Sequence, residues 1–83
     1  MITVKYFAQL RQMAGREEDQ FDLGAQATLD QLSDAIGLNL PKIGELVRDK
    51  KIMVSVNYDV VSADHIIKDG DEVALLPPFS GGA

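Results

Sequence analysis

The sequence predicts an α+β fold in which a mixed sheet packs on one main helix, and three observations support this class. Apolar and polar residues alternate from Ile2 onward, which is typical of a strand with one face on a core. A Thr-x-x-Gln motif begins at Thr28 and precedes apolar residues at helical spacing. Further apolar stretches, separated by turn residues, follow this helix. Strands are therefore expected on both sides of a helix, in one layered domain.

The first predicted strand covers the alternating stretch at the start of the chain. Its apolar residues of one parity are Ile2, Val4, Tyr6, Ala8 and Leu10. Phe7 falls on the opposite, polar parity, where a large aromatic ring must be covered by another segment or exposed to a partner. A short second strand is predicted around Phe21 and Leu23. Two strands this close in sequence favour an antiparallel pair.

The predicted helix begins after Thr28, because the Thr28 hydroxyl and the Gln31 side chain together form a capping box. Its apolar residues follow helical spacing and form one stripe. They are Leu29, Leu32, Ala35 and Ile36. Pro41 predicts the first turn of a second, shorter helix, since proline is favoured at that position.

Two more strands are predicted in the second half of the chain. The apolar, β-branched segment Ile52 to Val56 ends at a turn, and Val60 lies in a brief extended piece after it. An Asp-Gly turn precedes the last strand, Glu72 to Leu76, in which Val73 and Leu75 face inward while Ala74 and Leu76 face outward. The resulting order, β-β-α-β-β, is that of the ubiquitin-like β-grasp, the smallest common α+β arrangement of this kind.

Composition excludes several classes of function. The 83 residues include 13 acidic and 8 basic residues, for a net charge of −5, which disfavours binding to nucleic acid. The absence of cysteine excludes disulfides and zinc-thiolate sites. The acidic residues near Asp69 lack calcium-loop spacing and no phosphate-binding loop is present, so we expect no metal site and no nucleotide site on this chain. No secretion signal or membrane segment is evident, and we expect a cytoplasmic protein.

The periodic patterns stop after Leu76, which divides the chain into a predicted domain, residues 1–76, and a C-terminal tail, residues 77–83. The tail reads Pro77, Pro78, Phe79, Ser80, Gly81, Gly82 and Ala83. The two prolines end the sheet and favour an extended chain. Glycines allow a backbone to pass through a narrow channel and approach a reactive group closely. The alternative is that these small residues form an inert, frayed terminus.

The segment from Asp69 to Gly82 resembles the MoaD/ThiS family of sulfur carriers, in particular the small subunit of molybdopterin synthase. The resemblance extends to the segments 4–11, 56–57 and 61–65. It implies that the carboxylate of Gly82, preceded by Gly81, is adenylated, converted to a thiocarboxylate and inserted into a large synthase subunit. There its sulfur passes to cyclic pyranopterin monophosphate. The chain itself then acts as a non-catalytic sulfur donor whose catalytic residues lie in the partner.

The resemblance also implies which residues contact partners. They are Phe7, Val60, Leu76, Pro77, Pro78, Phe79 and Ser80. The implied partners are a MoaE-like large subunit and a MoeB-like, E1-like adenylating enzyme that uses ATP and magnesium. No nucleic acid, membrane or bound cofactor is expected.

The resemblance leaves two questions open, the role of Ala83 and the pathway. The family ends in Gly-Gly, whereas this chain continues to Ala83. Ala83 is either removed before activation, an addition to the natural chain, or itself the carrier of the thiocarboxylate. The pathway is also open, because a ThiS-like or cysteine-pathway carrier would use the same terminal chemistry. A ubiquitin-like binding module with an inert tail is a further alternative.

Overall fold

The structure is a computed structural model that describes residues 1–78. In chain order the elements are β1 (Ile2–Tyr6), α1 (Gln9–Ala14), β2 (Glu18–Phe21), β3 (Gln26–Thr28), α2 (Leu29–Gly37), α3 (Pro41–Arg48), β4 (Met53–Val56), β5 (Asp59–Val60), β6 (Ile66–Lys68) and β7 (Glu72–Leu76). The predicted α+β class is confirmed. The boundary between a domain and a tail at residue 76 stays a prediction, although β7 ends at Leu76.

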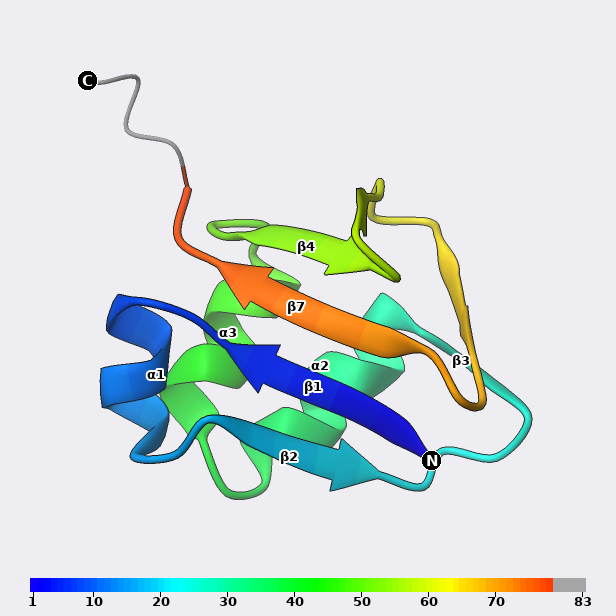
Figure 1. Cartoon of the computed structure of the whole chain (residues 1–83), viewed down its shortest axis with the longest axis horizontal. Coiled ribbons are helices and arrows are strands. Elements are labelled where there is room, and N and C mark those ends of the chain that lie inside the picture. The colour runs from blue at the N-terminus through cyan, green and yellow to red at the C-terminus, as the bar shows by residue number, and fades with distance from the viewer. Residues whose placement is uncertain (79–83) are drawn as a thin grey trace.

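The main sheet has five strands in the order β2-β1-β7-β4-β5 (Figure 1). Strands β1 and β7 are parallel, with Val4 opposite Val73, whereas the other neighbours are antiparallel. The predicted mixed sheet and the predicted antiparallel pairing of the first two strands are both confirmed. The first and last strands therefore lie side by side in the sheet, and the segment between them forms the long crossover that parallel strands need.

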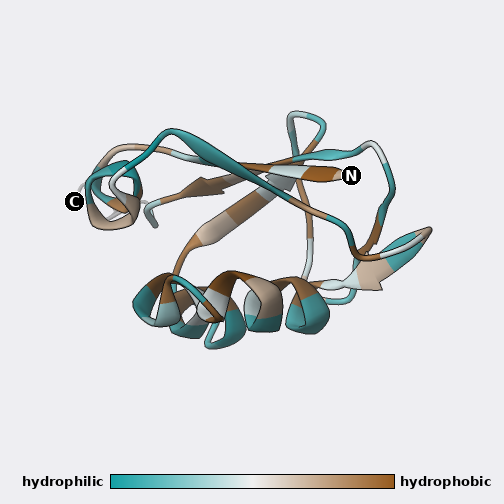
Figure 2. Cartoon of the chain, turned by 90° about the horizontal axis from the view of Figure 1, so that it is seen from below, coloured by the Kyte–Doolittle hydropathy of each residue, from teal (hydrophilic) through white to brown (hydrophobic). Residues whose placement is uncertain are grey.

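The helices α2 and α3 cover one face of this sheet, with their apolar sides turned toward it (Figure 2). Between the two layers lies a core of fully buried aliphatic side chains and one tyrosine. Its most buried members include Ile2, Val4, Tyr6, Leu32, Ile36, Ile43, Ile67, Val73 and Leu75. The alternation within β1 and β7 thus assigns one face of each strand to the core, while the side chains of the other face point away from the helices.

Helix α2 begins as predicted. The Thr28 hydroxyl accepts a hydrogen bond from the Gln31 backbone N–H at 3.0 Å, and the Thr28 N–H donates to the Gln31 side-chain oxygen at 2.9 Å. These two bonds satisfy donors that a helix start would otherwise leave free. The predicted stripe is buried at Leu29, Leu32 and Ile36.

The two main helices cross closely where glycines face each other. A Cβ atom added at Gly44 would lie 2.7 Å from the Gly37 Cα and 2.7 Å from the carbonyl oxygen of Ser33. Both atoms belong to the backbone, so neither can move aside as a flexible side chain could. The separation of α2 and α3, and with it the helical layer under the sheet, depends on the missing side chain at Gly44.

The prediction that the first strand continues to Leu10 is wrong. The strand ends at Tyr6, and a helix, α1, follows from Gln9 to Ala14. Ala8 has a positive φ of 51°, which breaks the extended chain. Leu10 is buried together with Ala14, four residues later, on one face of this helix. Leu10 fits both an alternating and a helical pattern, so alternation alone does not determine where the strand ends.

A second, two-stranded sheet formed by β3 and β6 was not predicted from the sequence. Each strand has three residues with a single buried side chain, Ala27 in β3 and Ile67 in β6. Such short segments carry too little alternation to be recognised locally. Their pairing, with Ala27 opposite Ile67, is a long-range contact.

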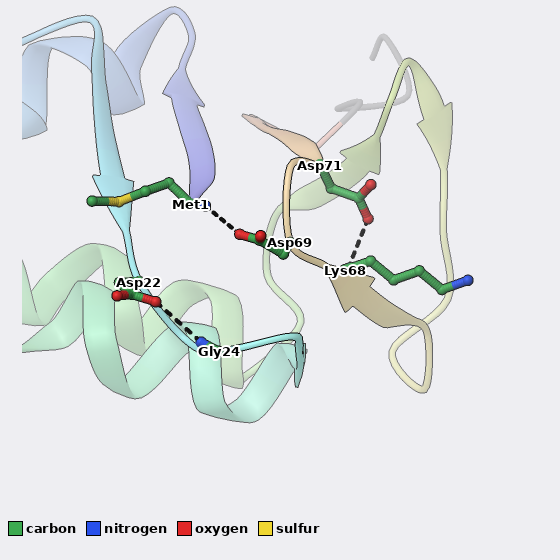
Figure 3. A network of polar contacts seen from close by, with 6 residues as sticks. All are labelled: Met1, Asp22, Gly24, Lys68, Asp69 and Asp71. Carbon is green, nitrogen blue, oxygen red and sulfur yellow. Dashed lines mark hydrogen bonds and ion pairs between the residues drawn. The ribbon is translucent and has the colours of Figure 1, made fainter.

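Polar contacts fasten the start of β1 to the turn that precedes β7 (Figure 3). The amino group of Met1 forms an ion pair with the Asp69 carboxylate, and the Gly70 N–H donates to the Met1 carbonyl at 3.0 Å. Within the turn, Asp71 Oδ2 accepts from the Lys68 N–H at 2.8 Å. Gly70 has φ 89°, as an Asp-Gly turn requires. These contacts support the parallel alignment of β1 and β7.

Replacing Asp71 with Asn is expected to destabilise the fold by about 1 kcal/mol at about pH 7. The Lys68 N–H and, to a smaller extent, the Asn57 side chain donate to the carboxylate and hold the pKa of Asp71 below its ordinary value of 3.8. The carboxylate therefore stabilises the fold above pH 3.8, and this contribution is lost as the pH falls through the lower pKa of the folded chain. Urea unfolding at several pH values measures the effect. The exposed Asp49→Asn variant is the control, and a gap between wild type and Asp71→Asn that persists in acid contradicts the assignment.

Candidate functional site

The face of the sheet turned away from the helices is built from register partners on adjacent strands. On the core face Tyr6 lies opposite Leu75, and on the outer face Met53 lies opposite Leu76. The Phe7 N–H donates to the Leu75 carbonyl at 3.2 Å, so Phe7 continues this alignment beside Leu76. Directly opposite residues share a face of a sheet. Phe7, Leu76 and Met53 therefore form a row across the outer face where β1 and β7 end.

A second row lies next to the first, runs from Lys5 to Val60, and adds the apolar side chains of Ala74 and Val60. Ala74 is opposite Ser55, and Ser55 is opposite Val60 at the edge of the sheet. Phe7 is 41% exposed and Val60 is 64% exposed, which leaves both side chains free to be covered by a partner. We call Phe7, Met53, Val60, Ala74 and Leu76 the outer patch.

Charged and polar residues border the outer patch on the side away from the end of β7. Lys5 Nζ lies 3.7 Å from Glu72 Oε2, and Thr3 lies opposite Glu72. The neighbouring strand β2 adds Glu18, opposite Lys5. An apolar centre with a polar border is typical of protein-binding surfaces.

The end of β1 that carries Phe7 is held by its buried neighbour Tyr6. The Tyr6 hydroxyl donates to Asp19 Oδ2 at 2.8 Å, and Arg16 Nε lies 2.7 Å from the same carboxylate. Burial, with the hydrogen bond to Asp19, raises the pKa of Tyr6 far above its usual range, so the phenol keeps its proton and remains a donor. This bond ties β1 to β2 and thereby positions Phe7.

The predicted site residues divide into those that the structure describes and those that it does not. Phe7, Val60 and Leu76 lie in the outer patch, and Pro77 and Pro78 follow directly at the end of β7, the first half-buried and the second exposed. The others, Phe79, Ser80, Gly81 and Gly82, lie outside the described residues, as does Ala83.

Sequence reasoning did not select Met53 and Ala74 for the site. Met53 belongs to the predicted strand Ile52 to Val56, and its shared parity with Ser55, the polar residue two positions later, could have assigned it to the outer face. Ala74 was predicted to face outward, but its place between Ser55 and Lys5 depends on which strands pair. That information is not local to either strand.

The part of the chain that the structure describes contains no group of three His, Cys, Asp or Glu side chains able to hold a metal ion. Its helices are also all too short to span a bilayer.

His65 lines a depression together with Asn57 and Asp71, at the opposite end of β7 from Leu76. The outer patch and His65 are therefore separate features of the surface.

A five-stranded mixed sheet on two helices, with an exposed apolar patch where the last strand ends, defines the class of ubiquitin-like β-grasp proteins. Comparison with known proteins narrows this class. The ThiS family matches residues 4–82, and the chain therefore belongs to the ThiS family of sulfur carriers, which includes MoaD.

Individual relatives agree with this assignment. The molybdopterin synthase sulfur carrier subunit of Escherichia coli K12 is 36% identical over 83 residues, covering 99% of this chain and 100% of that protein. A solved structure from Pyrococcus furiosus, described as molybdopterin converting factor subunit 1, has a TM-score of 0.76 at 35% identity and covers 93% of this chain and 95% of its own. The Amycolatopsis orientalis BexX/CysO complex contains a chain with a TM-score of 0.70 at 27% identity, with coverage of 99% and 100%. The predicted fold class is confirmed by these structures.

Proposed function

We propose that this chain is the sulfur carrier subunit of a molybdopterin synthase and carries sulfur as a thiocarboxylate on Gly82. The observation that carries the proposal is the position of the outer patch beside the end of β7, from which the Gly-Gly segment continues. A partner that covers Phe7 and Leu76 would receive the tail at the same time. The similarity to molybdopterin synthase sulfur carrier subunits supports the choice of pathway.

The proposed chemistry uses the end of the chain in place of a catalytic side chain. Hydrolysis of the Gly82–Ala83 peptide bond would first release alanine and free the Gly82 carboxylate, which ATP then converts to an acyl adenylate with release of pyrophosphate. A donor of sulfide-level sulfur then displaces AMP and leaves a thiocarboxylate. This group gives its sulfur to cyclic pyranopterin monophosphate, and water returns the acyl group to a carboxylate. Gly81 and Gly82 lack side chains, which suits a narrow channel in the partner. Pro77, Pro78, Phe79 and Ser80 would line the contact that leads into this channel.

Two partners follow from this chemistry. A MoeB-like adenylating enzyme would bind ATP and magnesium, and a MoaE-like large subunit would hold the pterin. Both would use the outer patch as a common docking surface, so they would bind in turn. The net charge of −5 is complementary to the basic site that a phosphorylated pterin requires.

A ThiS-like or cysteine-pathway carrier is the second candidate. The similarity to a chain of the Amycolatopsis orientalis BexX/CysO complex, which is not named as a molybdopterin synthase, supports it. The outer patch and the tail would serve either pathway. A ubiquitin-like binding module would use the patch alone.

The first test is copurification of the full chain with a pterin-binding large subunit and, in parallel, with a thiazole synthase. Retention of the large subunit alone is expected, and retention of the thiazole synthase alone contradicts the molybdopterin assignment.

In the same assay, Phe7→Ser is expected to weaken binding to the large subunit by about 2 kcal/mol, roughly 30-fold, because it removes a central aromatic anchor. Leu38→Ser is the matched control, since Leu38 is 85% exposed next to α2 and lies outside the patch. Equal affinities of the two variants would remove Phe7 from the interface.

A further inference from the structure

A groove opens at the edge of the molecule where β4 and β5 meet the ends of the two main helices. Its volume is about 260 Å³, enough for one large apolar side chain. Leu29, Val47, Ile52, Val54 and Val61 contribute apolar lining. Nothing in the proposed sulfur chemistry uses this groove.

The groove is continuous with the outer patch. Met53 and Val60 belong to the patch and also line the groove. Met53 is opposite Leu76, so the groove lies near the end of β7. A partner that covers the patch beside Leu76 would therefore reach the groove without further movement.

Lys50, at the rim of the groove, has a backbone conformation that favours glycine. Helix α3 ends with the Lys50 N–H donating to Val47 at 3.2 Å and the Lys51 N–H donating to Leu46 at 3.0 Å. This pair of bonds is a Schellman motif, in which the residue corresponding to Lys50 is usually glycine. Lys50 has φ 59°, which is disfavoured for a residue with a Cβ atom. A lysine at a position that glycine would occupy without strain is consistent with a use for its ammonium group.

The charges at the groove differ in sign from the charge of the whole chain. Arg48 and Lys50 line it together with a single carboxylate, Asp30, whereas the chain has a net charge of −5. Arg48 is already paired with Asp34. The four ion pairs found within residues 1–78 do not include Lys50. The groove therefore presents an ammonium group beside an apolar cavity, which is complementary to an acidic segment with an apolar anchor.

We propose that the groove binds a segment of the large synthase subunit in which one large apolar side chain fills the cavity and an adjacent Asp or Glu pairs with Lys50. The inference rests on the proposed function, because the large subunit is the protein that covers the outer patch. The groove adds a second contact, which would hold the carrier in a fixed orientation on the large subunit while its tail is inserted. The pairing with Lys50 also favours partners that carry a carboxylate at this point.

Neighbouring lysines provide a matched test. Lys50→Glu is expected to raise the Kd for the large subunit about tenfold or more, because it places a carboxylate against a carboxylate. Lys51→Glu makes the same change of charge one residue away, at a position that does not line the groove, and is expected to change the Kd less than about twofold. Lys50→Gly is expected to raise both the Kd and the melting temperature, since it removes the ammonium group and the strain together. A purely structural role for Lys50 would not weaken binding while stabilising the fold.

The outcomes separate the two proposals. Equal effects of Lys50→Glu and Lys51→Glu overturn the groove assignment and leave the proposed function standing. Failure of the wild-type chain to bind the large subunit overturns both the groove assignment and the proposed function.

A chain lacking residues 79–83 tests whether the chain's own tail fills the groove. If amide signals of Val47 and Ile52 in the isolated protein shift on this deletion, the tail occupies the groove and the partner assignment is wrong.

Discussion

A chain that ends at Ser80, without Gly81, Gly82 and Ala83, is expected to lose sulfur transfer completely while it keeps its fold. The described elements end at β7, so the deletion removes no residue of a described helix or strand. It removes the proposed carrier carboxylate from the position that Gly82 would reach. We expect no molybdopterin from cyclic pyranopterin monophosphate in the reconstituted synthase, together with an unchanged circular dichroism spectrum and an unchanged melting temperature.

The truncated chain also separates a carrier from a binding module. If the outer patch supplies most of the binding energy, the truncated chain still binds the large subunit and competes with the full-length chain. Inhibition by the truncated chain in a reaction with full-length carrier is therefore expected. Sulfur transfer that continues at the wild-type rate without residues 81–83 would refute a carrier role for the terminus.

The Gly44→Ala substitution is expected to destabilise the fold by about 2 kcal/mol and to lower the melting temperature by about 10 °C. The new Cβ atom would lie 2.7 Å from backbone atoms of α2, so the two main helices must separate. The better helix propensity of alanine, about 1 kcal/mol, offsets only part of this cost. Thermal unfolding followed by circular dichroism measures the difference directly.

Gly37→Ala is the matched control for this substitution. A Cβ atom at Gly37 meets only the Gly44 Cα, at an ordinary 4.0 Å. We expect this variant to be neutral or more stable by about 0.5 kcal/mol, since alanine is the better helix former. Equal destabilisation by the two variants would show that helix packing at Gly44 is not the reason.

The sequence predicted the parts of the fold that depend on neighbours in the chain. The Thr28 capping box and the apolar stripe through Leu32 predict α2. The capping box satisfies free N–H donors at the start of the helix, and the stripe forms its buried face, so both depend only on residues close in sequence. Alternation assigned Leu76 to the outer face and identified Phe7 as the exception to its strand. Both assignments need only the two-residue period of a strand.

The parts that depend on distant segments were not predictable in this way. The parallel pairing of β1 with β7 brings Phe7 next to Leu76, although almost the whole chain separates them. The pairing of β4 with β7 adds Met53 to the patch. The groove at Lys50 requires both helix ends and the edge of the sheet, and the positive φ of Lys50 cannot be read from a sequence that has no glycine there.

The central claim is that the chain carries sulfur on the carboxylate of Gly82. Mass spectrometry of the intact chain and of its C-terminal peptide, after incubation with an adenylating enzyme, ATP, magnesium and a sulfur source, tests it most directly. We predict efficient replacement of one carboxylate oxygen by sulfur on a chain that ends at Gly82, and impaired replacement on a chain that retains Ala83. Efficient adenylation or thiocarboxylation of a retained Ala83, or no thiocarboxylate on a chain that ends at Gly82, would contradict the claim.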